Sequence, residues 1–185
     1  MKKIFYVVGV LVIVSIGFFA FLYQYNYNKY DFQAQSIDGN VSLKSFDGKY
    51  KVLYFGYVFC PDVCPTSLNM VSTVLNDIKA KDVDLLFVTL DPKRDDVKSC
   101  DEFAKYFYKD AYCLRITPKE KLDKVVENYG SKYKIVKQED SAMEYSVAHS
   151  SFLYLFDKKG RMVKEISDLT YNNVKKEFEN LLKNY

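Results

Sequence analysis

Cys60 and Cys64, which are separated by three residues, are the first candidates for chemistry in this chain. The β-branched and aromatic residues from Val52 to Phe59 predict a buried strand, and Pro65 opens a helical pattern. Both sulfurs are therefore expected where strand gives way to helix. The unpaired N–H groups and the dipole at a helix start stabilise a thiolate, which lowers a cysteine pKa below its usual value of about 8.5. A thiolate at this place can bind a metal ion or attack a disulfide.

The chain contains one histidine, His149, between a polar segment and the apolar residues from Phe152 to Phe156. A lone histidine is more often a capping or core side chain than a ligand. In a thioredoxin-like sheet, however, the loop before this late strand lies at the same end as the Cys60 loop, so the imidazole is expected to meet both sulfurs. Two thiolates and one imidazole suit Cu(I) and also accept Cu(II) or Zn(II). Structural zinc sites usually close four ligands, and a fourth is missing here.

The rest of the sequence predicts an α/β domain with alternating strands and helices. A helical pattern between two apolar runs is typical of a β-α-β unit in a parallel sheet, and a closing hairpin and helix suggest a thioredoxin-like fold. The predicted strands are 32–37, 41–43, 51–59, 83–90, 112–116, 132–138, 151–157 and 161–166, the predicted helices are 66–79, 97–109, 118–129 and 170–182, and 139–148 is predicted to be a loop.

Three segments carry a resemblance to a known family. They are Tyr54-Phe55-Gly56-Tyr57 leading into Cys60-Pro61-Asp62-Val63-Cys64-Pro65, then Thr89-Leu90-Asp91-Pro92-Lys93-Arg94-Asp95, then His149-Ser150. From about Asp31 onward the chain resembles the Sco (SenC/PrrC) family of copper-binding assembly proteins for respiratory oxidases. The resemblance implies that Cys60, Cys64 and His149 hold copper, as Cu(I) or Cu(II), in a thioredoxin-like domain. It also implies an upstream copper donor protein and a respiratory oxidase subunit that receives the copper.

The chain departs from the family pattern at two positions. Ala148 stands where the family commonly has Asp before the histidine, which removes a carboxylate beside the ligand and leaves the three ligands in place. Asp96 replaces the Thr that often follows the Arg-Asp pair. Asp91 and Arg94 fit a structural ion pair as well as a functional role, and they are left outside the predicted site.

Two functions of different class fit the predicted site. The first is a metallochaperone that passes copper to a partner by ligand exchange, and it uses Cys60, Cys64 and His149. The second is a thiol-disulfide oxidoreductase in which Cys60 attacks and Cys64 resolves, keeping the copper-site cysteines of a partner reduced. Thioredoxin-like redox motifs usually have two residues between the cysteines, so three residues that include Pro61 favour ligation. A disulfide staple is the structural alternative. A peroxiredoxin-like peroxidase is disfavoured, because Tyr57 and Pro61 stand where it would place its motif residues.

The segment from Ile4 to Tyr23 is twenty residues long and carries no formal charge, which is enough to cross about 30 Å of hydrocarbon as a helix. Lys2 and Lys3 precede it, so the positive-inside rule predicts that the rest of the chain is exported. The apolar run continues beyond the small residues at which a signal peptidase would cut, which favours an anchor over a cleaved signal peptide. We expect residues 1–30 to be a membrane anchor and tether, and residues 31–185 to be the copper-binding domain. This places a single-pass protein in the inner membrane, with its soluble domain in the periplasm.

The charge balance argues against a nucleic-acid partner. The net charge is +3, and without Lys2 and Lys3 the chain carries 25 basic and 24 acidic groups. Acidic residues are interleaved with the lysines, which is typical of a solvated surface.

The other two cysteines, Cys100 and Cys113, are thirteen residues apart and join a predicted helix to the next predicted strand. In an oxidising compartment such a pair can close a structural disulfide. Two buried thiols are the alternative, and the sequence does not choose between them.

Overall fold

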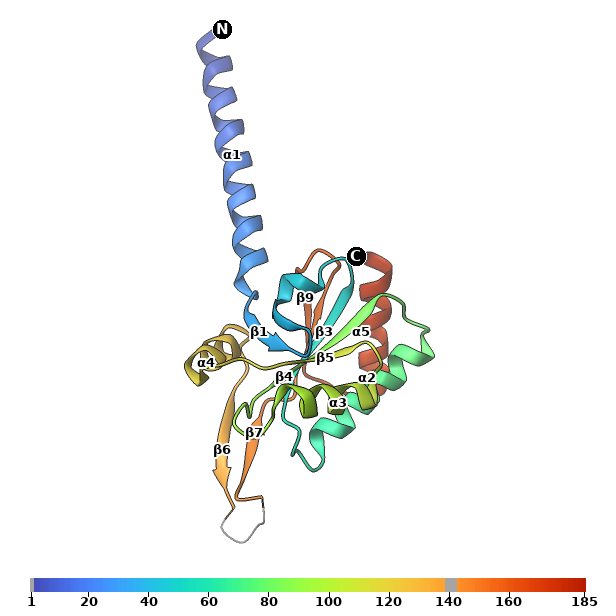
Figure 1. The fold of residues 1–185 in the computed structure, drawn as a ribbon. Coiled ribbons are helices and arrows are strands. Elements are labelled where there is room, and N and C mark those ends of the chain that lie inside the picture. The colour runs from blue at the N-terminus through green and yellow to red at the C-terminus, as the bar shows by residue number, and fades with distance from the viewer. Residues whose placement is uncertain (1, 139–142) are drawn as a thin grey trace.

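The structure, a computed structural model, describes residues 2–138 and 143–185. Its centre is a five-stranded sheet with the order β5-β4-β3-β8-β9 (Figure 1). The strands are β3 (Tyr50–Gly56), β4 (Val83–Thr89), β5 (Ala111–Leu114), β8 (Leu153–Phe156) and β9 (Met162–Ile166). β3, β4 and β5 run parallel to one another, whereas β8 and β9 join antiparallel. The predicted α/β class and its closing hairpin are confirmed.

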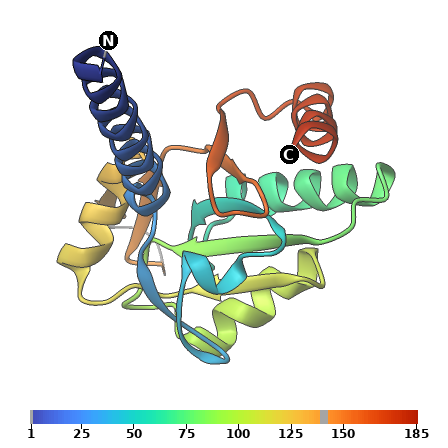
Figure 2. The same ribbon diagram turned by 90° about the horizontal axis from the view of Figure 1, so that it is seen from above.

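Helices cover both faces of this sheet. α2 (Val63–Asp77) and α5 (Tyr171–Asn184) pack together on one face, and α3 (Val97–Phe107) lies on the other (Figure 2). Every residue of β3 and of β4 is buried as a result. This double cover is the reason why both strands are nearly continuous apolar runs in the sequence.

Three helix starts differ from the prediction, and that of α5 lies at Tyr171, one residue after the predicted start at 170. α2 begins at Val63, before the predicted start, so Cys64 lies in its first turn. α4 (Lys119–Asn128) has Pro118 at its N-cap, so the predicted start at Pro118 is one residue early. In contrast, Asp96 is a regular N-cap of α3 and accepts hydrogen bonds from the backbone N–H groups of the first turn.

The domain opens with the predicted hairpin. β1 (Gln33–Ser36) pairs with β2 (Gly39–Ser42), and a short 3-10 helix, η1 (Leu43–Phe46), follows. Gly39 has a φ of 109°, which L side chains rarely adopt, so a glycine is needed at this turn.

A second hairpin corrects one prediction. β6 (Tyr133–Lys137) and β7 (Tyr145–His149) form a separate two-stranded antiparallel sheet that extends from the body of the domain (Figure 1). The predicted loop 139–148 is therefore wrong from residue 145 onward, and residues 139–142 lie outside the described part. Only Val147 of β7 is buried, and the alternation of Tyr145, Ser146 and Val147 is too short to predict a strand.

The N-terminal helix α1 (Lys2–Lys29) points away from the domain (Figure 1). Among the residues whose side chains the structure describes, no helix has the length and apolar content needed to cross a membrane. The predicted transmembrane helix therefore gains no support from this finding. Where α1 ends, the Tyr129 hydroxyl donates a hydrogen bond of 2.8 Å to the Tyr30 carbonyl oxygen.

Cys100 and Cys113 form a disulfide between α3 and β5, with their Cα atoms 5.6 Å apart. Both are fully buried. Of the two alternatives that the sequence left open, the structure has the disulfide.

Candidate metal centre

The end of β3 and the start of α2 bring the two free cysteines together. Cys60 lies in the turn between these elements, and Cys64 lies in the first helical turn. The Cys64 backbone N–H points at the Cys60 sulfur, with a nitrogen to sulfur distance of 3.4 Å. Both sulfurs are therefore at the positive end of α2, which is a place that favours a thiolate.

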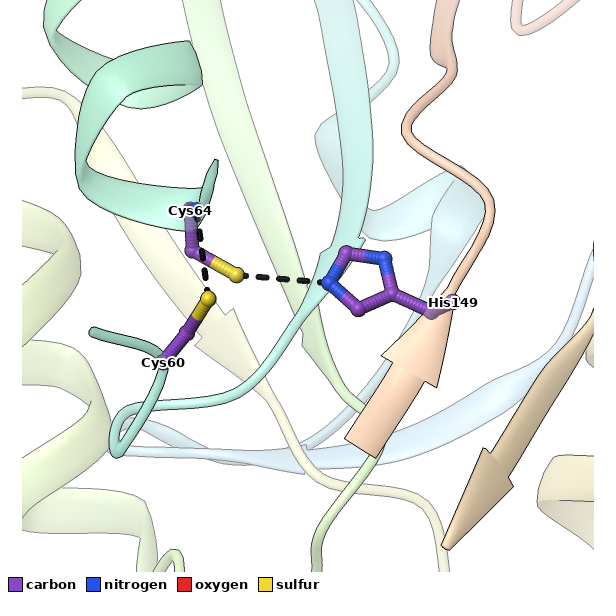
Figure 3. A group of neighbouring side chains, drawn as sticks. All are labelled: Cys60, Cys64 and His149. Carbon is purple, nitrogen blue, oxygen red and sulfur yellow. Dashed lines mark hydrogen bonds between the residues drawn. The ribbon is translucent and has the colours of Figure 1, made fainter. Parts of the chain in front are cut away.

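His149, the last residue of β7, faces the same two sulfurs (Figure 3). Its Nε2 atom is 3.5 Å from the Cys64 sulfur, and the ligand atoms of Cys60, Cys64 and His149 all lie within 4.8 Å of one another. The structure thus brings together three residues that the sequence separates by up to 89 positions. They come from three elements: a turn, a helix start and a strand end.

The second ring nitrogen of His149 fixes the tautomer of the neutral imidazole. Nδ1 is 3.0 Å from the Ser150 carbonyl oxygen, which can only accept a hydrogen bond. Nδ1 must therefore carry the proton, and Nε2 points its lone pair toward the sulfurs. A backbone carbonyl in this position is the usual partner of a metal-binding histidine. The rings of Tyr54 and Tyr57 meet the imidazole edge-on, each with centroids 6.1 Å away, and hold its orientation.

The surroundings make the two sulfurs unequal. A hydrogen bond from the Cys64 thiol, together with hydrogen bonds from the backbone N–H groups of Cys64 and Asp62, holds the pKa of Cys60 well below its ordinary value. The same hydrogen bond, together with burial, raises the pKa of Cys64. The metal-free site therefore holds one thiolate and one thiol. A metal that binds both sulfurs must displace the Cys64 proton.

Asp95 holds the cysteine turn in place. Its carboxylate accepts hydrogen bonds from the Val58 backbone N–H at 3.0 Å and from the Thr89 hydroxyl at 2.6 Å. Val58 is two residues before Cys60, so a buried carboxylate on the loop after β4 positions the turn that carries the first ligand. No local pattern in the sequence predicts this role of Asp95, although the residue belongs to one of the segments that carry the family resemblance.

Arg94 connects the same loop to the histidine strand. Its guanidinium pairs with Asp91, donates to the carbonyl oxygens of Met143 and Tyr145 at 3.0 and 3.1 Å, and lies 3.7 Å over the Tyr145 ring. The Tyr145 hydroxyl in turn donates to Asp91 at 2.9 Å. Asp91 and Arg94 do form the ion pair that the sequence suggested. They also anchor the start of the strand that ends at His149. The loop 91–95 therefore positions both the cysteine turn and the strand that carries the histidine.

Gly56 is required by the close packing behind the sulfurs. A Cβ atom at this position would lie 2.7 Å from the Phe87 ring and 3.0 Å from both the Cys64 sulfur and the Tyr54 ring. A side chain here would have to displace the Phe87 ring and would crowd the Cys64 sulfur. Ala148, by contrast, is exposed on β7 opposite Lys134, so the place beside the histidine where the family commonly has a carboxylate is open.

The donor set fits a soft metal ion with few ligands. Two sulfurs and one imidazole nitrogen match the preferences of Cu(I), and among the described residues no further Cys, His, Asp or Glu joins the group. Cys64 is fully buried and Cys60 is 9% exposed, so the site is shielded from water and opens through Cys60 and the half-buried imidazole. Such an incomplete shell allows a metal to enter and leave.

Comparison with known proteins gives a family. The family model described as SCO1/SenC matches residues 24–182. An SCO2-like protein of Rickettsia prowazekii is 32% identical over 151 residues, which cover 78% of this chain and 73% of that protein. Across four rickettsial relatives of this kind, the matched region spans 58 to 73% of their length.

Solved structures agree with this assignment. The crystal structure of Arabidopsis thaliana ScoI with copper bound has a TM-score of 0.76 at 29% identity, covering 84% of this chain and 98% of that one. The structure of Bradyrhizobium japonicum ScoI with copper bound has a TM-score of 0.68 at 31% identity, covering 82% and 97%. The match of the family model over most of the chain, together with these relatives, shows that the chain belongs to the SCO1/SenC family.

Proposed function

We propose that this chain is a copper chaperone that binds one copper ion through Cys60, Cys64 and His149 and delivers it for assembly of a respiratory oxidase. The observation that carries the proposal is the convergence of three soft or borderline ligand atoms within 4.8 Å of one another. Two relatives of known structure, from Arabidopsis thaliana and Bradyrhizobium japonicum, are described with copper bound. Delivery to an oxidase rests on the resemblance to the Sco family.

The geometry supports loading and release of the metal. Cys60 supplies a thiolate that is already ionised, Cys64 gives up its proton as the metal arrives, and His149 offers its Nε2 lone pair. Because Cys60 and His149 are less buried than Cys64, a partner thiol can approach from their side and replace them one at a time. The copper would then leave by ligand exchange without becoming a free ion.

The test is a titration of the reduced full chain with Cu(I) in the presence of a competing Cu(I) chelator. The proposal predicts one copper per chain and a loss of affinity in His149→Ala that exceeds the roughly 10 to 100-fold typical of a change beside a ligand. Ser146→Ala, on the same strand, is the matched control and should keep the wild-type affinity. If His149→Ala binds copper as tightly as the wild type, the three-ligand site is wrong.

Delivery to the oxidase needs a separate test in cells. Cells that lack the chain should show lower cytochrome oxidase activity, and the wild-type chain should restore it while Cys60→Ser does not. Full oxidase activity in the deleted cells would refute delivery and leave copper binding untouched.

A thiol-disulfide oxidoreductase is the second candidate, and the low pKa of Cys60 favours it. The Cys60 thiolate would attack a partner disulfide, forming a mixed disulfide and releasing one partner thiolate. Cys64 would then attack the Cys60 sulfur, releasing the second partner thiol and leaving Cys60 and Cys64 oxidised. This reaction needs no histidine, so His149→Ala separates the two functions: it should abolish tight copper binding and leave disulfide exchange with a model disulfide.

We also propose that α1 anchors the protein in the inner membrane in a single pass, with residues 31–185 in the periplasm. The support is the uncharged segment from Ile4 to Tyr23 behind Lys2 and Lys3. Its large aliphatic and phenylalanine side chains are exposed, with exposed fractions from 37% at Leu22 to 71% at Ile13. Membranes washed with alkaline carbonate should retain the full chain. Release of the intact full chain into the wash would contradict the anchor.

A further inference from the structure

A mainly apolar groove lies beside the hairpin β6–β7, outside the metal centre. Its volume is about 350 Å³, which is within the range of pockets that bind ligands. One wall is the loop after β4, with Leu90 and Pro92, and the other is the hairpin, with Tyr133, Ile135 and Tyr145. The groove is large enough for at least one bulky apolar side chain.

The strand β6 presents alternate residues to this groove. Tyr133, Ile135 and Lys137 line it, whereas Lys134 and Val136 do not, as expected from the two faces of a strand. Ile135 is 45% exposed, so nearly half of this large aliphatic side chain is in contact with water at the groove. An apolar group that filled the groove would remove this surface from water.

The groove is also rimmed by lysines. Lys93, Lys119 and Lys137 line it. Lys119 is paired with Asp123, but within residues 2–138 and 143–185 no carboxylate forms a salt bridge with Lys93 or Lys137. The Asp91 carboxylate at the groove is engaged by Arg94 and by the Tyr145 hydroxyl. The rim therefore has excess positive charge, and an occupant with negative charge would complement it.

The shape of the surroundings favours an extended peptide as the occupant. β6 pairs with β7 along one edge, and no described strand pairs with its other edge. A peptide that added to this edge would satisfy the unpaired backbone groups of β6. Its alternate side chains would point to the same face as Ile135, toward the groove.

We propose that this groove binds an extended acidic segment of a protein partner, which inserts one large apolar side chain between Ile135 and Pro92 and places its carboxylates near Lys93 and Lys137. This binding goes beyond the copper function and does not require the metal. Because Tyr145 and Asp91 belong both to the groove and to the network that positions His149, a partner held here would lie alongside the metal site.

The test uses the metal-free full chain in phosphatidylcholine nanodiscs. The probe is a pentapeptide with a central phenylalanine between two pairs of aspartates, and isothermal calorimetry measures its affinity. Two control peptides replace the phenylalanine by alanine or all the aspartates by lysines. Each control peptide is expected to bind at least tenfold more weakly than the probe.

Matched variants on the two faces of β6 locate the binding. Ile135→Asp and Lys137→Glu change the groove, whereas Val136→Asp and Lys134→Glu make the same changes on the other face. The groove variants should weaken binding of the probe at least tenfold, and the controls should bind as the wild type does. Far-UV circular dichroism and the Cu(I) affinity of each variant check that the fold and the metal site are intact.

Three results would overturn the proposal. The first is no binding of the probe to the wild type at millimolar concentration. The second is equal binding to groove and control variants. The third is binding of laurate that depends on Ile135 and Lys137 in the same way, together with no binding of the probe peptide. A failure of copper binding in the wild type would refute the chaperone function and leave this test unaffected.

Discussion

The two cysteine pairs of this chain are buried to nearly the same extent, yet they differ in every other respect. Cys100 and Cys113 are closed in a disulfide between α3 and β5 and are fully buried. Cys60 and Cys64 form no disulfide, and their exposed fractions are only 9% and 0%. Burial therefore does not decide which pair is reactive.

The neighbours of the sulfurs decide it. Cys60 and Cys64 share a helix start, a backbone N–H that points at a sulfur, and an imidazole with its lone pair turned inward. The pair Cys100–Cys113 links a helix to a strand in the apolar core. The surroundings of Cys60 and Cys64 therefore suit a charge or a metal ion. The Cys100–Cys113 disulfide instead restricts the conformational freedom of the unfolded chain.

The largest expected difference in copper affinity is between a change in the free pair and the loss of the disulfide pair. Cys60→Ser should lower the Cu(I) affinity by more than about 100-fold, because it replaces a soft ligand by a hard one. The double change Cys100→Ser and Cys113→Ser should leave that affinity unchanged. It should instead lower the free energy of unfolding by about 3 kcal/mol, as expected for a loop of this length. Chelator competition and thermal unfolding measure the two effects, and a loss of copper affinity in the double variant would break the comparison.

Alkylation sharpens the comparison within the free pair. In the reduced metal-free protein, iodoacetamide should modify Cys60 at least about 100-fold faster than Cys64, because only the thiolate reacts. The pKa of Cys60 lies below its ordinary value, so the rate should stay constant as the pH falls from about 8.5 to about 6, where an unperturbed thiol would lose its reactivity. Peptide mass spectrometry identifies the modified residue. Modification of Cys64 first would contradict the assigned inequality of the two sulfurs.

A change in the loop 91–95, which positions the ligand residues, should give the next largest effect on copper affinity. Arg94→Lys removes the contacts to β7 while keeping the charge, so His149 should be held less firmly and the Cu(I) affinity should fall by roughly 10 to 100-fold. The alkylation rate of Cys60 should change much less, because Asp95 still holds the cysteine turn. Arg161→Lys, which alters a similar ion pair with Asp157, is the matched control. Equal copper affinities of both variants and the wild type would remove Arg94 from the site.

The smallest effect is expected at Gly56. Gly56→Ala places a methyl group against Phe87 and the Cys64 sulfur, and it should cost about 1 to 3 kcal/mol of stability and weaken copper binding modestly. Gly17→Ala is the control, because a Cβ atom there meets nothing within 4 Å. Thermal unfolding measures the cost. An unchanged midpoint in Gly56→Ala would show that the packing behind the sulfurs is looser than described.

The sequence predicts the parts of this protein that local patterns determine. The apolar runs of β3 and β4, with a helical pattern between them, predict the sheet because both faces are covered. The cysteine spacing at the end of β3 predicts a thiolate site for a similar reason, because the two cysteines and the helix start are adjacent in the chain. The disulfide was one of two alternatives, because pairing depends on distances that spacing does not give.

The parts that depend on distant residues could not be predicted in this way. β7 buries one residue and is held by its pairing with β6, so its short alternation did not suffice to predict a strand. The role of Arg94 is equally hidden, because its hydrogen-bond acceptors Met143 and Tyr145 follow it by about 50 positions. The convergence of His149 with the cysteines was expected from an assumed thioredoxin-like sheet and from the family resemblance, not from any local pattern.

X-ray absorption at the copper edge of the Cu(I)-loaded full chain tests the central claim most directly. The account predicts two sulfur scatterers and one imidazole nitrogen around one copper ion, with the imidazole signal lost in His149→Ala. A copper ion surrounded by sulfur alone in the wild type, or an imidazole signal that persists in His149→Ala, would contradict the three-ligand site.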